Sequence, residues 1–271
     1  MSVVPTSSIE RAAARLLHAA RTRTPCTPVR DLIGSTNLRA AYAVQARLTE
    51  ERLASGSTAV GRKIGLTSPA VQEQLGVSQP DLGVLFDDMM IVDGTTVDAR
   101  TFLQPRVEAE IAFVLGDDLV SGPLDRSQIR GALDHAVAAI EICDSRVAAW
   151  DITFGDTVAD NASAGAFVLG VAPRSLADFD PVAATMSMTI DGAEASTGSG
   201  AACLGDPLEA VAWLARNSRE LGEPLRAGEI VLSGALGPMR PVAAGAHVTA
   251  DITGLGTVSV RFGTTKEGDG S

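Results

Sequence analysis

Residues 107–115 read Val-Glu-Ala-Glu-Ile-Ala-Phe-Val-Leu, and this stretch places two carboxylates inside an otherwise apolar run. With the two-residue period of a strand, Glu108 and Glu110 share one face and the opposite face is apolar. Because the run is apolar on both faces beyond these two residues, we expect a buried strand. Adjacent carboxylates in that setting repel each other and lose hydration, unless one is protonated or both bind a metal or a basic partner.

A third glutamate, Glu141, lies in a similar apolar context within residues 138–143. Three carboxylates suit a hard, oxygen-preferring cation such as Mg²⁺ or Mn²⁺. The alternative is that Glu108 and Glu110 lie on a solvated edge strand and Glu141 on a helix surface, where no cation is required. The recurrence of glutamate at position 141 favours the metal.

The composition is that of a globular protein, with 45% hydrophobic and 20% charged residues among 271. It shows neither the low complexity of disordered chains nor a heptad pattern. The formal net charge of -11 argues against nucleic acid or an anionic membrane as a partner, since both attract basic surfaces. A small anionic substrate is compatible with this charge when local basic groups and a metal hold it.

The N-terminal stretch has no continuous apolar segment of signal-peptide length, and no later segment is long and apolar enough to span a bilayer. We therefore expect a cytoplasmic protein. The three cysteines, Cys26, Cys143 and Cys203, are widely spaced and form no Cys-x-x-Cys motif. This spacing indicates reduced, buried thiols rather than disulfides or a zinc site.

Helical periodicity in the first fifth of the chain gives way, after residues 55–57, to short β-like runs. We expect helices at residues 8–21, 37–54, 127–139 and 207–217, the last with Asp206 as N-cap and Pro207 at the first helical position. We expect strands at residues 59–66, 83–86, 90–92, 107–115, 166–171, 185–190, 230–233, 247–252 and 257–262, and Glu141 at the start of a further strand.

This order of elements lacks regular strand–helix alternation and predicts an α+β fold. We expect a small N-terminal helical region at residues 1–57, a catalytic β-rich domain with a mixed, rolled sheet at residues 58–263, and a disordered tail at residues 264–271.

Two further residues are candidates for acid–base chemistry. Lys63 lies within the small and apolar residues 60–65, where desolvation would lower its pKa toward the range useful for proton transfer. Taken alone, Lys63 is more simply a lysine that reaches solvent or neutralises the glutamates. Asp81, within residues 79–83, is expected in a turn, where its side chain would bond its own backbone.

Two segments after Glu141 have simpler structural interpretations. Asp144 and Arg146 are expected to form hydrogen bonds or an ion pair. Residues 150–165 are rich in small polar groups, which suits a loop entering a pocket or ordinary capping and turn chemistry.

Five motifs occur together in residues 61–67 (GRKIGLT), 79–83 (QPDLG), 104–111 (QPRVEAEI), 141–146 (EICDSR) and 160–163 (DNAS). Their order closely resembles the 2-keto-4-pentenoate hydratase family, of the fumarylacetoacetate hydrolase-like superfold, over nearly the whole chain. The resemblance implies metal ligands at Glu108, Glu110 and Glu141, and acid–base residues at Lys63 and Asp81. It further implies substrate-binding residues, which are Leu82, Asn161 and Ser163.

The same resemblance implies a metal-dependent hydratase that converts 2-hydroxypenta-2,4-dienoate to 4-hydroxy-2-oxopentanoate in the catabolism of aromatic or steroid rings. Its cofactor would be Mg²⁺ or Mn²⁺, and its substrate a small anionic 2-hydroxydienoate. The implied partners are further copies of the chain in a homo-oligomer and a downstream aldolase, with no nucleic acid and no membrane.

Two alternatives stay open. The 4-oxalocrotonate decarboxylases resemble the chain across the same motifs, although Gln104 and residues 150–161 favour the hydratase. The second alternative is a non-catalytic partner subunit of a pathway complex. The set of apolar-flanked carboxylates counts against it, because a scaffold has no need of buried charge.

Overall fold

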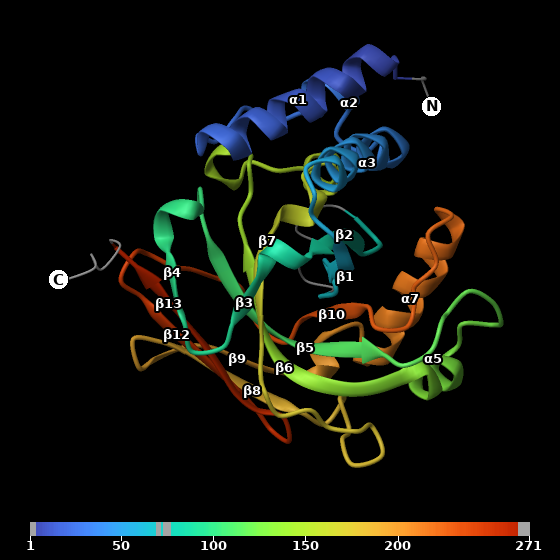
Figure 1. Ribbon diagram of the computed structural model, residues 1–271, viewed down its shortest axis with the longest axis vertical. Coiled ribbons are helices and arrows are strands. Elements are labelled where there is room, and N and C mark those ends of the chain that lie inside the picture. The colour runs from blue at the N-terminus through green and yellow to red at the C-terminus, as the bar shows by residue number, and fades with distance from the viewer. Residues whose placement is uncertain (1–3, 69–71, 73–76, 265–271) are drawn as a thin grey trace.

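The computed structural model describes residues 4–68, 72 and 77–264, which form helices and two β-sheets (Figure 1). The described helices include α1 (Thr6–Thr22), α2 (Arg30–Ile33), α3 (Leu38–Ala54), α5 (Arg126–Ala132), α6 (Phe154–Ala159) and α7 (Pro207–Glu220). The expected helices at residues 8–21, 37–54 and 207–217 are confirmed. In α7, Asp206 caps the helix by accepting a hydrogen bond from the backbone N–H of Leu208 at 2.9 Å, and Pro207 takes the first helical position.

The larger sheet has eight strands, with β11 (Arg240–Pro241) paired to the first residues of β5. Its other strands follow the order β2 (Asp81–Phe86), β1 (Ala59–Gly65), β10 (Ile230–Ala235), β5 (Arg106–Leu115), β6 (Leu133–Cys143), β7 (Ala164–Leu169) and β3 (Met90–Val92). The smaller sheet has the order β4 (Thr96–Asp98), β13 (Gly256–Gly263), β12 (His247–Ile252), β8 (Thr185–Ile190) and β9 (Ala193–Ser199).

Both sheets mix parallel and antiparallel pairs. β1 runs parallel to β10, β3 to β7 and β4 to β13, whereas long antiparallel pairs such as β5 with β6 make up most of the remainder. The predicted α+β class and mixed pairing are confirmed. The division of the chain at residue 57 stays a prediction.

The main hydrophobic core lies on one face of the larger sheet. Strand β5 directs alternate residues into it. The same core is closed by β12 and β13 of the smaller sheet, which pack across β6, and by α7, which covers β1 and β10. The β5 residues in this core are Val107, Ala109, Ile111, Phe113 and Leu115, all buried. Since side chains alternate along a strand, the remaining face of β5 presents Glu108 and Glu110 on the side away from the smaller sheet.

The expected helix at residues 127–139 is wrong in its second half. Helix α5 ends at Ala132, and β6 continues directly from Leu133 to Cys143. Alanines at 136, 138 and 139 favour a helix locally, but this segment pairs with β5 along its length and is buried on both faces, so tertiary pairing outweighs propensity. Glu141 therefore lies near the end of β6, not at the start of a strand.

Of the two interpretations of residues 150–165, a loop entering a pocket and ordinary capping and turn chemistry, the structure agrees with the second, since Thr153 and Asp156 cap helix α6. The segment forms the end of a 3₁₀ turn, helix α6, a second 3₁₀ turn at Asn161–Ser163 and the start of β7. Of the tail predicted to be disordered, residues 265–271 lie outside the described part of the chain.

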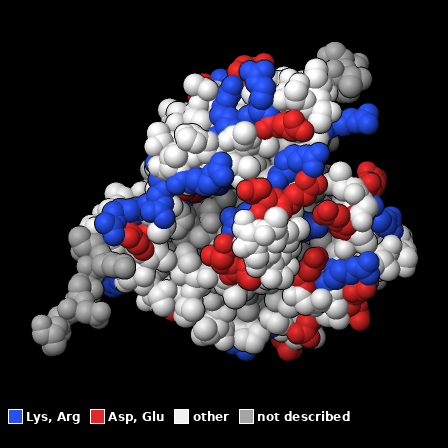
Figure 2. Space-filling view, turned by 45° about the horizontal axis from the view of Figure 1, so that its top comes forward, with Lys and Arg blue, Asp and Glu red and all other residues white. Residues whose placement is uncertain are grey.

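None of the described helices is long and apolar enough to cross a membrane. Acidic and basic side chains are interspersed over the face shown in Figure 2, which carries the N-terminal helices. The excess of acidic residues in the sequence therefore does not make a single acidic patch on that face.

The N-terminal helices form a layer over the larger sheet (Figure 1) and share a second hydrophobic cluster with α6. Asp156 of α6, which is fully buried, also binds this layer through polar contacts. One carboxylate oxygen accepts hydrogen bonds from the backbone N–H groups of Val29 and Arg30, both at 2.8 Å. The other accepts from the Arg30 guanidinium at 3.0 Å and from the Thr153 backbone N–H at 2.9 Å.

Replacing Asp156 with Ala is expected to lower the free energy of unfolding by about 3–5 kcal/mol, because it leaves several buried donors without their acceptor and removes one of the two carboxylate partners of Arg30. Asp151 is the matched control, since its carboxylate pairs with the same Arg30 at 2.6 Å but its side chain is 64% exposed. Asp151→Ala should cost at most about 1 kcal/mol. Chemical denaturation of both variants checks this, and equal losses would contradict the role of Asp156.

Candidate metal centre and acid–base site

The register of β5 and β6 places two glutamates directly opposite each other. Glu108 pairs with Glu141 across the antiparallel ladder, and Glu110 follows two residues along the same face of β5. Directly opposed residues have Cβ atoms about 4.5–5.5 Å apart, and like charges there destabilise the sheet. Glu110 and Glu141 are buried and Glu108 is half-buried. The backbone pairing thus concentrates three carboxylates at one place.

Several oxygens of these carboxylates are not satisfied by protein donors. The backbone N–H of Gly234 donates to one oxygen of Glu110 at 2.7 Å. Within the described part of the chain, the other Glu110 oxygen and Glu141 Oε2 have no hydrogen-bond partner. Such buried acceptors are costly unless a proton or a cation satisfies them. The donor set, oxygen-rich and partly orphaned, fits a hard divalent cation.

Cys143 was not singled out from the sequence as part of this site. Its sulfur lies 3.8 Å from Glu108 Oε1, and single ligand atoms of Glu108, Glu141 and Cys143 lie within 4.8 Å of one another. Burial, followed by the charge of Glu141, raises the pKa of the Cys143 thiol well above its ordinary value. The sequence signal was the i, i+2 spacing from Glu141, which becomes visible once residues 133–143 are assigned to a strand.

Burial and the charge of neighbouring carboxylates make Glu108 and Glu110 hard to ionise without a cation. Burial, with the nearby charge of Glu141, raises the pKa of Glu108 to about 7. The same causes raise the pKa of Glu110 well above its ordinary value, with the charge of Glu108 adding to them. Protons therefore compete with any cation for these carboxylates.

Lys63 is the basic group of the site. It lies on β1, paired with Gly83 of β2 and Leu232 of β10, and it is 2% exposed. Its Nζ lies 2.7 Å from Glu141 Oε1 and donates a hydrogen bond to the carbonyl oxygen of Ala162 at 2.9 Å. The lysine therefore bridges the glutamate pair and the 3₁₀ turn before β7.

The expected direction of the Lys63 pKa shift is wrong. Burial alone would lower the pKa of Lys63, but the negative charge of neighbouring groups, Cys143, Glu141 and Glu108 first among them, outweighs it and raises the pKa well above its ordinary value. A lysine paired with buried carboxylates keeps its proton, so Lys63 enters chemistry as an ammonium.

The sequence context of Asp81 suggested a turn, but Asp81 does not lie in one. It opens β2, pairs with Gly65 of β1 and is 1% exposed. Because Gly83 pairs with Lys63 two residues farther on, the register puts the Asp81 and Lys63 side chains on the same face. Asp81 Oδ2 accepts a weak hydrogen bond from the Thr157 hydroxyl at 3.3 Å. Burial raises the pKa of Asp81, while the charge of Lys63 opposes that shift.

The three residues expected to bind substrate differ in how they lie. Leu82 packs in the main core, on the sheet face opposite Asp81 and Lys63. Asn161 and Ser163 lie in the turn that contacts Lys63. The Asn161 amide is bonded to the backbone of Val84, and the Ser163 hydroxyl lies 3.4 Å from an Asp160 oxygen. Their role in substrate binding stays a prediction.

Asp144 and Arg146 have the structural roles predicted for them. Asp144 accepts backbone hydrogen bonds from Leu103 and Gln104, and the Arg146 guanidinium pairs with buried Asp160 at 2.5 Å. These contacts stabilise the chain where β6 ends, next to the glutamates.

Comparison with known proteins shows which family the chain belongs to. Residues 54–262 match the fumarylacetoacetate hydrolase C-terminal family model. The chain is 53% identical to the TodF product hydratase of Pseudomonas putida F1, over 95% of this chain and 96% of the relative. It is 49% identical to a 2-keto-4-pentenoate hydratase of Paraburkholderia xenovorans, over 93% of this chain and 94% of the relative.

A solved structure of 4-oxalocrotonate decarboxylase from Pseudomonas putida G7, complexed with magnesium and adipate, has the same fold. It superposes with a TM-score of 0.92 at 32% sequence identity and covers 97% of this chain and 100% of that one. The family match and the identity to the curated relatives extend over most of the sequence. The chain therefore belongs to the fumarylacetoacetate hydrolase family and, within it, to the 2-keto-4-pentenoate hydratases.

Proposed function

We propose that this chain adds water to 2-hydroxypenta-2,4-dienoate and forms 4-hydroxy-2-oxopentanoate, as a step in the breakdown of aromatic rings. The observation that carries the proposal is the opposed pair Glu108 and Glu141 with Lys63 bound beside it. This arrangement joins a cation site to a proton carrier in a chain about half identical to proteins named as hydratases.

The cofactor that we propose is Mg²⁺ or Mn²⁺, held by Glu108, Glu110 and Glu141. The orphaned oxygens of Glu110 and Glu141 support this ligand set. When bound, the cation supplies a Lewis acid for the substrate carboxylate and the C2 oxygen.

The chain's own residues move the protons. In the dienol, the proton of the 2-hydroxyl leaves and a proton arrives at C5, which gives a conjugated 2-oxo-3-enoate. Water then adds at C4 and a proton arrives at C3, so the net change is one water. Lys63 holds a proton at Nζ that it can deliver to carbon. Asp81, with its raised pKa, can accept a proton and return it.

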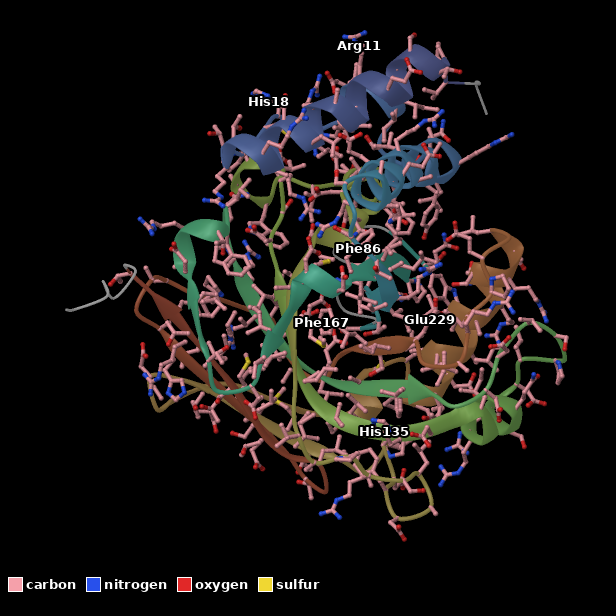
Figure 3. All side chains as sticks on the ribbon, in the orientation of Figure 1. Arg11, His18, Phe86, His135, Phe167 and Glu229 are labelled. Carbon is pink, nitrogen blue, oxygen red and sulfur yellow. The ribbon has the colours of Figure 1, made fainter. Side chains whose placement is uncertain are left out.

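An apolar cluster lies beside these groups. Phe167 on β7 pairs with Glu141 in register and shares this hydrophobic cluster with Phe86, and both phenylalanines are labelled in Figure 3. Exclusion of water by this cluster strengthens the electrostatic contacts of Lys63 with the carboxylates. The same apolar cluster suits the hydrocarbon part of a dienoate.

The proposal is tested by mixing the purified protein with Mg²⁺ or Mn²⁺ and the dienol, and following the ultraviolet absorbance of the conjugated acid. We expect the absorbance to fall without release of CO₂. Release of CO₂ from a 4-oxalocrotonate-type substrate would instead identify a decarboxylase. No turnover of either substrate would leave a non-catalytic partner subunit.

Replacing Glu108 with Gln is expected to lower metal-dependent turnover by at least about 10²-fold, since loss of a ligand exceeds the effect of losing an outer-shell partner. Calorimetric titration should show a parallel loss of Mn²⁺ affinity, with the far-ultraviolet circular dichroism unchanged. Glu194→Gln on β9, an exposed glutamate, is the control and should behave as wild type. Wild-type activity and metal affinity in Glu108→Gln would remove Glu108 from the ligand set.

The raised pKa of Glu108 predicts a pH-dependent stability. A carboxyl whose pKa rises on folding stabilises the fold while protonated, and this contribution is lost as the pH rises from the ordinary pKa of 4.5 to about 7. In the presence of a metal chelator, the free energy of unfolding of the wild-type protein should fall over this pH range relative to that of Glu108→Gln. The rise in Tm on adding Mg²⁺ should grow over the same range, because fewer protons then compete for the site. A metal-induced Tm shift independent of pH would contradict the assignment.

A further inference from the structure

The 3₁₀ turn at Asn161–Ser163 has a left-handed backbone. Three consecutive non-glycine residues have positive φ, with values of 56° for Asn161, 50° for Ala162 and 53° for Ser163. For residues with side chains this conformation costs about 1–2 kcal/mol each and rarely extends beyond one residue. Such strain persists where surrounding contacts determine the conformation, and it concentrates at functional sites.

The Asn161 side chain supplies the contacts that hold the turn. Its Oδ1 accepts a hydrogen bond from the backbone N–H of Val84 at 2.8 Å, and its Nδ2 donates to the Val84 carbonyl at 2.9 Å. The amide therefore bonds β2 as a neighbouring strand would. Both of its polar ends are used on the backbone, and Asn161 is 8% exposed.

The turn lies directly against the strand position that faces Lys63. A Cβ added to Gly83 would lie 2.6 Å from the Asn161 carbonyl oxygen and 3.1 Å from Lys63 Cγ. The absence of a side chain at position 83 thus allows the turn to approach both β2 and the stem of the lysine. At this distance the Ala162 carbonyl accepts the hydrogen bond from Lys63 Nζ.

The Ala162 carbonyl is important because the other oxygen partner of Lys63, Glu141 Oε1, is also a proposed ligand of the cation. Glu141 Oε1, 2.7 Å from Nζ, belongs to the proposed metal ligands, so a cation and the ammonium compete for its charge. The Ala162 oxygen is outside that ligand set. Nζ also lies 3.9 Å from Cys143 Sγ, which is a longer and weaker contact, so the Ala162 oxygen is the stronger of the two contacts that can keep Nζ in place with the cofactor bound.

We propose that Asn161 is a positioning residue: its amide fastens the left-handed turn to Val84, and the turn fixes Lys63 Nζ through the Ala162 carbonyl. This inference rests on the proposed function, in which Lys63 delivers a proton. It gives Asn161 a role through Lys63 in place of the substrate contact implied by the family resemblance.

The first variant is Asn161→Gly. Glycine adopts positive φ without strain, so the change removes the amide and leaves the backbone free to keep or lose the turn. We expect kcat to fall by about 10²-fold, the order of loss produced by misplacing a reacting group by about 1 Å. KM should stay within about twofold of wild type, since the substrate contacts are untouched.

Gly83→Ala reaches the turn from the other side with the Asn161 amide intact. The added methyl would meet the Asn161 carbonyl oxygen at 2.6 Å and Lys63 Cγ at 3.1 Å, so it displaces the turn, the stem of the lysine or both. The same fall in kcat without a change in KM is expected; this variant tests how activity depends on the position of Lys63, while Asn161→Gly tests the role of the amide.

Asp191→Gly is the matched control. Asp191 also has a positive φ, 53°, and its carboxylate accepts the backbone N–H of His247 at 2.9 Å in the turn between β8 and β9 of the smaller sheet. It should lower stability by less than Asn161→Gly, because Asp191 is exposed and loses one hydrogen bond, and it should leave kcat at the wild-type value. This separates a specific effect on Lys63 from a general loss of a turn-stabilising bond.

A crystal structure of Asn161→Gly measures the position of Lys63 without reference to activity. We expect the 2.9 Å contact between Nζ and the Ala162 oxygen to be lost. A kept contact overturns the inference, and so does a KM rise at unchanged kcat, which would indicate substrate binding by Asn161. A wild-type protein inactive on the dienol would refute the proposed function alone, and the crystal structure would still decide the position of Lys63.

Discussion

The opposition of Glu108 and Glu141 across the β5–β6 ladder is the constraint around which the rest of the site is built. Two carboxylates facing each other in a sheet are unfavourable unless positive charge lies between or beside them. Lys63 supplies part of that charge from β1, two strands away from β5. The oxygens of Glu110 and Glu141 that have no hydrogen-bond partner among the described residues could accept further positive charge. The opposed carboxylates therefore lower the stability of the sheet, and the proposed cation would offset this cost. The large core on the other face of the sheet stabilises the fold.

Much of this was predictable from the sequence because it depends on alternation. Glu108 and Glu110 lie two residues apart within an apolar run, and that spacing alone puts them on one face of a buried strand. Their partner on β6 could not be placed so well. Residues 133–143 are rich in alanine and apolar on both faces, so periodicity does not separate a helix from a strand there. Because residues up to 139 were expected in a helix and Glu141 at the start of a strand, the register that opposes Glu141 to Glu108 and adds Cys143 to the site was missed.

Lys63 and Asp81 show a second limit of local reasoning, because the sign of a pKa shift is a property of three-dimensional neighbours. The apolar residues around Lys63 predict a lowered pKa, yet the carboxylates that reverse it come from strands far along the chain. Asp81 follows a proline and precedes a glycine two residues on, which is typical of a turn, but pairing with β1 makes it a strand residue. In both cases the decisive contact is nonlocal, whereas the local sequence describes only the backbone's own preferences.

The hydratase and the decarboxylase similar to this chain can share one scaffold because both reactions stabilise the same enolate charge next to a carboxylate. The groups that we propose for this common demand, three glutamates and a lysine, lie on the regular strands β1, β5 and β6, where register fixes them. What differs between the reactions is the proton path and the far end of the substrate. The groups nearest those differences, Asp81 at a strand start and the strained turn at Asn161–Ser163, lie where strands begin and end. Strand ends can change without disturbing the ladder, so divergence of function is expected to be concentrated there.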